Sequence, residues 1–170
     1  MSAIQQQVEQ ASARYSSSFT QGHLALPPAK KYLVLTCMDA RIDPVRAFGI
    51  GLGDAHVIRN AGASARDALR SIIISEQLLG TQEIVLVKHT GCGMLTFKND
   101  DAFGLVEKNL GDDAAAELKS KNFDFLPFPE LDRAVEDDVR YIKGSKLIPD
   151  SVTVSGWVYE VETGKTRRVV

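Results

Sequence analysis

The sequence predicts an α/β protein with an open, mostly parallel β-sheet that is flanked by helices. Three short runs rich in apolar residues are typical of buried strands, and they cover residues 32–36, 55–59 and 83–88. Segments in which apolar residues recur at helical spacing alternate with these strand-like runs along the chain. This alternation favours parallel strands joined by crossover helices. No repeat or inter-domain linker divides the chain, so we expect residues 1–170 to form a single domain.

The composition is that of an ordinary globular protein, with 44% hydrophobic and 25% charged residues. A net charge of −2 gives no reason to expect binding to nucleic acid or to an anionic membrane. No apolar run is long enough to span a bilayer, and the N-terminus lacks the basic start and apolar core of a secretory signal. Because two cysteines do not make a disulfide scaffold, we expect a cytoplasmic protein.

The first elements are predicted from apolar spacing and from capping residues. Residues 3–18 carry apolar side chains at helical spacing, which predicts a projecting amphipathic helix that covers a partner subunit. A linker over residues 21–31 leads into the strand at 32–36. Asp43 and Pro44 then predict the start of a short helix, with the aspartate as its N-cap.

Turn signals divide the middle of the chain. The strand at 55–59 ends in the turn Asn60-Ala61-Gly62. Ser64 is placed to cap an amphipathic helix that Gly80 ends, and the strand at 83–88 follows. These features predict a strand–helix–strand unit, in which the two strands are parallel.

The last third of the chain begins with its least regular pattern, over residues 95–127. Residues 103–110 and 114–119 are compatible with short helices, and the proline-broken apolar segment 123–129 is expected to pack over a surface. The remaining elements are clearer. We expect a helix from Leu131 to Gly144, a strand at 152–159, a hairpin turn at 162–165 and a returning strand at 166–170 that forms an antiparallel edge.

Two cysteines and a histidine follow predicted strands. Cys37 comes directly after the first strand, and His89 and Cys92 come after the third. Because the carboxyl ends of parallel strands meet at one edge of a sheet, we expect the three side chains to converge there. Thiolate and imidazole donors favour zinc among common metals. The alternatives are two buried core thiols, or a disulfide between neighbouring strands.

Three further polar residues are candidates for chemistry near these donors. In an extended segment Asp39 and Arg41 would point to the same side as Cys37, so Asp39 could be a fourth ligand or accept a hydrogen bond from bound water. The alternative is a surface ion pair of small energetic value. His56 is a candidate proton shuttle, although a hydrogen-bonded structural histidine is the more general expectation.

The motifs Cys37-Met38-Asp39-Ala40-Arg41 and His89-Thr90-Gly91-Cys92 together resemble those of the beta-class carbonic anhydrases, in particular the compact members. The turn Arg59-Asn60-Ala61-Gly62 is also similar to that family, and the likeness runs from about residue 31 to residue 94. The resemblance implies that Cys37, His89 and Cys92 bind Zn²⁺ and that Asn60, Ala61 and Gly62 line the site. It also implies that Asp39 either binds zinc in a closed state or pairs with Arg41 in an open one.

The activity implied by the resemblance is that of a zinc lyase, a carbonate dehydratase. Such an enzyme reversibly hydrates carbon dioxide to bicarbonate and a proton, through attack by zinc-bound hydroxide. The alternative substrate is carbonyl sulfide or carbon disulfide, whose carbon the same nucleophile can attack. A third reading is a non-catalytic binding module in which Asp39 permanently closes the zinc site. The resemblance further implies a homodimer or a larger homo-oligomer.

Overall fold

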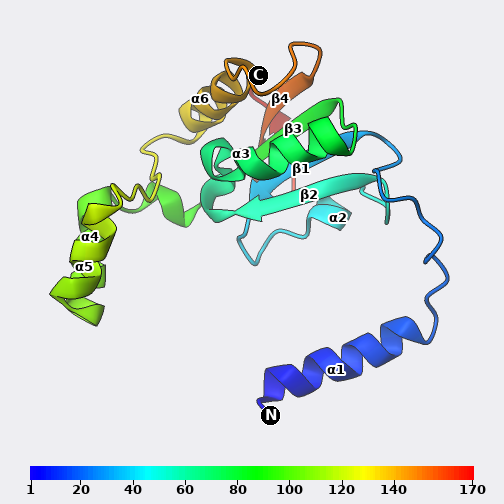
Figure 1. The fold of residues 1–170 in the computed structure, drawn as a ribbon, viewed down its shortest axis with the longest axis horizontal. Coiled ribbons are helices and arrows are strands. Elements are labelled where there is room, and N and C mark those ends of the chain that lie inside the picture. Colours follow the sequence, from blue (N-terminus) through cyan, green and yellow to red (C-terminus); the bar gives the residue numbers. More distant parts are fainter.

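Five strands form one twisted sheet in the computed structural model, which describes residues 1–170 (Figure 1). The strand order is β2-β1-β3-β4-β5, in which β1 to β4 are parallel and β5 is antiparallel to β4. The strands are β1 Tyr32–Cys37, β2 Ala55–Asn60, β3 Glu83–His89, β4 Thr153–Tyr159 and β5 Thr166–Arg168. This topology confirms the predicted fold class, including the antiparallel C-terminal edge.

Helices cover the sheet, and two helical segments project from it (Figure 1). The helices are α1 Ala3–Ser16, α2 Pro44–Ala47, α3 Ala65–Ile73, α4 Asn99–Leu110, α5 Asp112–Ser120 and α6 Leu131–Lys143. Single turns of other helix types lie at η1 Ala61–Ala63, η2 Ile74–Leu78 and η3 Gly93–Leu95. The α4–α5 hairpin and α1 extend away from the sheet. No helix combines the length and the apolar character needed to cross a membrane.

The predicted helix starts agree with the structure where a capping side chain defines them. Asp43 accepts a hydrogen bond from the Arg46 backbone N–H at 3.3 Å, and Ser64 accepts one from the Asp67 N–H at 3.3 Å. Gly80 ends the helical segment with a φ of +72°, a conformation that favours glycine. The last turn before it, η2, is π-helical, which apolar spacing alone does not reveal.

The segment predicted least well contains more helix than the sequence indicated. The first helix of the hairpin, α4, begins at Asn99 rather than at residue 103, because its first turn is polar and carries no apolar periodicity. The Asp101 carboxylate accepts a hydrogen bond from the Lys98 backbone N–H at 2.8 Å, and this bond caps the helix start. Other boundaries differ by a few residues, as with β5, which ends at Arg168 instead of residue 170.

The main hydrophobic core lies between the sheet and the helices α3 and α6. Strand residues at alternate positions fill it, as the two-residue period of a strand requires. These residues are Leu33, Leu35, Ile84, Leu86, Val154 and Val158, each no more than 5% exposed. A smaller core around Val34, Val87 and Ile50 occupies the opposite face. Because both faces of β1 and β3 are covered, the carboxyl ends of these strands are held rigidly side by side.

Glu76 is a buried carboxyl group in the π-helical turn η2, and neither of its carboxylate oxygens has a hydrogen-bond partner. The residue is only 7% exposed. Burial penalises the charged form and raises the pKa of Glu76 to about 7. Because the pKa in the folded state lies above the ordinary value, Glu76 favours folding most strongly below about pH 4.5. This contribution decreases as the pH rises through about 7.

The Glu76→Gln variant should therefore remove a pH-dependent part of the stability. When the pH is raised from about 5.5 to about 8, the free energy of unfolding of wild type should fall by about 2 kcal/mol more than that of Glu76→Gln. Urea denaturation of both proteins at the two pH values, at equal protein concentration, measures this difference. If the difference between the two proteins does not change with pH, Glu76 does not titrate in this range.

Candidate metal centre

The structure brings Cys37, His89 and Cys92 together at one edge of the sheet. Cys37 is the last residue of β1 and His89 is the last residue of β3, and these two strands are adjacent. Cys92 lies in the short loop after β3. One donor atom from each of the three residues lies within 4.8 Å of the other two, and all three residues are at least 95% buried. Two thiols and an imidazole therefore form one enclosed cluster, as the strand ends predicted.

The orientation of the His89 ring suits metal binding. His89 Nδ1 lies 2.9 Å from the backbone carbonyl oxygen of Thr90, to which it donates in the Nδ1–H tautomer. The other ring nitrogen, Nε2, is buried and has no hydrogen-bond partner. A buried nitrogen without a partner is costly in a folded protein unless something else binds it. The free lone pair of Nε2, beside two soft sulfur donors, fits a zinc ion.

The two cysteines are free and lie next to each other, and each shifts the pKa of the other. A hydrogen bond from the Cys92 thiol lowers the pKa of Cys37 to about 4, and the Gly62 backbone N–H adds a second donor at 3.4 Å from Cys37 Sγ. The interaction with Cys37, followed by burial, raises the pKa of Cys92, and the nearby Lys88 charge acts in the opposite direction. Cys37 is therefore the more acidic thiol of the pair, and the structure shows no disulfide.

Asp39 and Arg41 form a two-point ion pair at the rim of the cluster. Arg41 Nε donates to Asp39 Oδ1 at 2.9 Å, and Arg41 Nη2 donates to Asp39 Oδ2 at 2.8 Å. These bonds hold the pKa of the Asp39 carboxyl well below its usual range. Asp39 Oδ2 also lies 3.7 Å from His89 Nε2, so the carboxylate faces the cluster. Arg41 Nη2 reaches the carbonyl oxygen of Gly91 at 2.9 Å, which links the two loops.

The sequence argument for this pair was wrong about the backbone, although the pair forms. Alternation along an extended segment would place residues 37, 39 and 41 on one side. The chain instead turns at residues 40–41, where the Ile42 N–H donates to the Asp39 carbonyl at 3.1 Å. The turn brings Arg41 back against Asp39, and local geometry rather than strand alternation makes the contact.

The turn after β2 braces Cys37 from the other side. The Asn60 side chain accepts from the Ser64 N–H at 2.7 Å and donates to the Ser64 carbonyl at 2.9 Å, so it closes the turn over Ala61 and Gly62. Gly62 has a φ of +72°, and this conformation directs its N–H to Cys37. The predicted site-lining turn thus contacts the cluster through the backbone of Gly62.

Arg59 has a role that the motif alone did not reveal. Its guanidinium donates to the carbonyl oxygens of Cys37 at 3.0 Å and Asp39 at 2.7 Å. These bonds hold the backbone on both sides of Met38, whose side chain is exposed. The only hint in the sequence is that Arg59 directly follows the apolar strand residues. Its partners could not be predicted, because they lie about 20 residues away in the chain.

His56 does not lie with the other candidates. It pairs with Leu33 near the start of β2, whereas Asn60 at the end of β2 pairs with Cys37. Four residues of strand separate the two positions by about 13 Å. His56 Nδ1 is instead 2.7 Å from the Ser75 hydroxyl oxygen. This contact agrees with the general expectation of a hydrogen-bonded structural histidine, and the position of His56 at the other end of β2 places the candidate shuttle away from the cluster.

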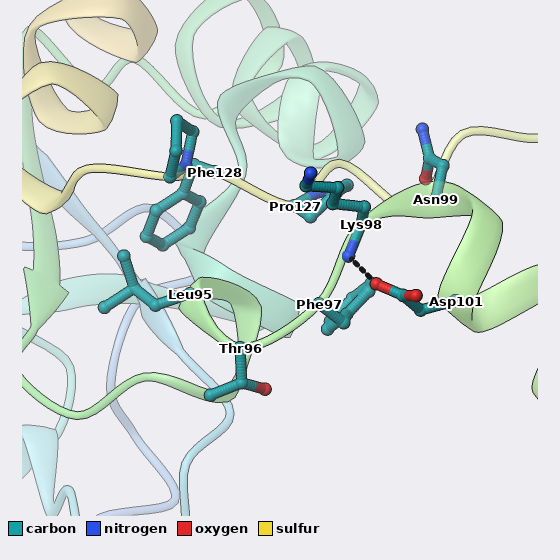
Figure 2. A pocket seen from close by; sticks show the side chains of 9 residues that line it. Leu95, Thr96, Phe97, Lys98, Asn99, Asp101, Pro127 and Phe128 are labelled. Atoms are coloured by element: carbon teal, nitrogen blue, oxygen red, sulfur yellow. Dashed lines mark hydrogen bonds between the residues drawn. The ribbon is translucent and has the colours of Figure 1, made fainter.

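An apolar shell encloses the cluster and separates it from a neighbouring cavity. The shell consists of Ile42, Phe48, Met94, Leu95, Phe128 and Tyr159. Leu95 and Phe128 also line a cavity of about 490 Å³ between the η3–α4 connection and residues 127–129. Figure 2 shows these two side chains on one side of the cavity, with Lys98 and Asp101 on the other. The cavity therefore lies directly outside the apolar shell.

Fold and cluster together define a class of protein: a parallel α/β domain that carries a two-cysteine, one-histidine centre at the carboxyl ends of its strands. Residues 32–166 match the carbonic anhydrase family. Beta-carbonic anhydrase 1 of Mycobacterium tuberculosis is 39% identical over 156 residues, which cover 91% of each chain. The solved structure of a carbonic anhydrase from Glaciozyma antarctica has a TM-score of 0.94 and 44% identity, with all of both chains covered.

A carbon disulfide hydrolase of Acidithiobacillus thiooxidans is also similar, with 34% identity over 179 residues that cover 97% of this chain and 90% of the hydrolase. The chain belongs to the beta-carbonic anhydrase family, as its two motifs indicated.

Proposed function

We propose that the protein is a zinc-dependent enzyme that reversibly hydrates carbon dioxide to bicarbonate and a proton. The observation that carries the proposal is the buried cluster in which Cys37, Cys92 and the unpartnered Nε2 of His89 lie together. The similarity to a mycobacterial beta-carbonic anhydrase over 91% of the chain supports the same reaction.

Cys37 Sγ, Cys92 Sγ and His89 Nε2 would hold the zinc ion. Three protein ligands are typical of catalytic zinc sites, in which a fourth position is left for chemistry. When bound, zinc supplies a Lewis acid that lets water act as a nucleophile. The Thr90 carbonyl fixes the imidazole tautomer, and the Gly62 N–H orients the sulfur of Cys37.

Asp39 would orient the reacting water. Its carboxylate is held by Arg41 and faces the donor cluster, and the lowered pKa keeps it an acceptor of hydrogen bonds throughout the working pH range. In the alternative closed state, Asp39 would leave Arg41 and become the fourth ligand. Arg41 therefore favours the open state, since both of its contacts with Asp39 are lost on closure.

The surroundings of the cluster suit a small uncharged substrate. Ile42, Met94 and Phe128 are part of an apolar shell that offers few polar partners. Carbon dioxide fits this environment, and so does carbonyl sulfide or carbon disulfide. Hydrolysis of these sulfur compounds is the second candidate function, and the similarity to a carbon disulfide hydrolase supports it. A permanently closed binding module receives less support, because Arg41 engages both oxygens of Asp39.

The direct test is an assay of the zinc-loaded protein with each gas across a pH range. Two thiolates and a neutral imidazole cancel the charge of a zinc ion, so water activation should need a more alkaline solution than at an all-histidine site. Carbon dioxide hydration measured by stopped flow should therefore rise from about pH 7 to about pH 9. A flat profile, or one that peaks in acid, would contradict the idea that water activation limits the rate. Turnover of carbon disulfide without hydration of carbon dioxide would support the second function.

A second prediction separates the role of Asp39 from that of the metal donors. Asp39→Ala should lower carbon dioxide hydration by at least about 10²-fold, yet keep about one zinc per chain, since three ligands remain. His89→Ala should lose the metal, whereas the control His56→Ala should keep both metal and activity, because His56 lies at the other end of its strand. Zinc analysis and stopped flow measure both quantities.

Loss of zinc from the Asp39 variant would show that this carboxylate is a structural ligand. In Arg41→Ala, the carboxylate loses its alternative partner, so the closed state should gain and activity should fall while zinc is retained.

We also infer that the protein forms at least a homodimer, in the cytoplasm, where its two thiols stay reduced. Every residue of α1 is exposed, including Ile4, Val8 and Tyr15 at 60–67%, and Figure 1 shows the helix separated from the sheet. An apolar stripe that stays exposed along the helix fits the surface of a second copy.

Removal of residues 1–23 should accordingly produce monomers or aggregates. Sedimentation velocity of the full chain and of the shortened chain checks this expectation. A full chain that sediments as a monomer at micromolar concentration would exclude the dimer.

A further inference from the structure

Lys88 is a buried cation beside the candidate metal centre that the proposed mechanism does not use. It precedes His89 in β3 and is only 2% exposed. Because strand side chains alternate, Lys88 continues the row of Ile84 and Leu86 and points to the face opposite His89. A lysine in a row of core residues needs polar partners, since an unpaired buried charge is costly.

Those partners join three separate parts of the chain. Lys88 Nζ donates to the Gly62 carbonyl at 2.7 Å and to the Ala63 carbonyl at 3.3 Å, and it forms an ion pair with Asp138 of α6 at 2.7 Å. The ammonium also lies 4.7 Å from the centre of the Phe128 ring, within range of a cation–π interaction. One buried group thus ties η1, α6 and the segment around residue 128 to the strand that carries His89.

The turn that Lys88 holds contacts the metal centre directly. The N–H of Gly62 donates to Cys37 Sγ, while its carbonyl accepts from Lys88. The space around Gly62 is also filled, because a Cβ added there would lie 2.8 Å from Met94 Cγ and 3.0 Å from Phe128 Cε1. The turn is therefore held between Lys88 and the apolar shell, and it cannot shift without moving the donor to the sulfur.

Given the zinc site proposed above, we propose that Lys88 is a positioning residue for the metal centre, which acts through Gly62 and depends on its ion pair with Asp138. The lysine holds the turn at the distance at which its N–H supports Cys37, and Asp138 neutralises the buried charge. Partners of this kind, one step removed from the metal, commonly change metal affinity by about 10- to 100-fold when they are removed.

The test compares Lys88→Met and Asp138→Asn with wild type in two measurements other than activity. The rate at which zinc passes to a chelator should rise about tenfold or more in Lys88→Met and in the same direction, to a smaller extent, in Asp138→Asn. In the cobalt(II)-substituted proteins, the thiolate-to-metal charge-transfer band should shift, because the hydrogen bond to Cys37 weakens. Lys30→Met is the matched control, since it removes an exposed lysine that pairs with Asp54 at 2.8 Å.

The outcomes distinguish this inference from the proposed function. If wild type binds no zinc, the proposed metal centre fails. If wild type binds zinc but the two variants only melt at lower temperature, with unchanged chelator rates and cobalt spectra, Lys88 has a merely structural role and the inference is overturned. Should Lys88→Met not fold, Asp138→Asn decides the matter, because it keeps the lysine but removes the ion pair on which the proposed role of Lys88 depends.

Discussion

The parallel pairing of β1 with β3 is the constraint on which the candidate metal centre depends. The register places Thr36 opposite Val87, so Cys37 and His89 emerge one and two residues later from neighbouring strands. A slip of one residue would turn the side chains of a strand to the opposite face. Both faces of the two strands are covered by closely packed cores, and a flipped strand would bring side chains of the wrong size and shape into each core. Ordinary core packing therefore fixes the separation of the donors.

Backbone groups orient the donor side chains that the strand register brings together. Two of the three cluster residues have a main-chain partner: Cys37 Sγ accepts from the Gly62 N–H, and His89 Nδ1 lies against the Thr90 carbonyl. Main-chain groups in tight turns have less freedom than long side chains, so they hold a ring or a sulfur with smaller entropic loss. Thr90 is itself fixed, because its N–H bonds to the Tyr159 carbonyl and its hydroxyl donates to Glu162. The β4–β5 end of the sheet thereby supports the histidine.

The sequence predicted those features that depend on position within a strand, and it missed those that depend on partners distant in the chain. Convergence of Cys37, His89 and Cys92 followed from their positions at strand ends, and the α/β class followed from the alternation of strand and helix patterns. The same reasoning failed for His56, because a residue near the start of a parallel strand lies at the opposite edge of the sheet. Lys88 follows the apolar run at residues 84–87, and its burial could not be predicted, because its partner Asp138 lies 50 residues further along and no periodicity connects the two.

The distribution of cations around the cluster explains why its sulfurs remain available to a metal. Arg41, Arg59 and Lys88 all lie near the two cysteines, yet none of them donates to sulfur. Arg41 is neutralised by Asp39 and Lys88 by Asp138, while Arg59 bonds to backbone carbonyls. A cation placed directly on a thiolate would compete with the metal for its charge, whereas a peptide N–H orients the sulfur without neutralising it. Each positive group near the two cysteines therefore pairs with a carboxylate or a backbone carbonyl instead of with sulfur.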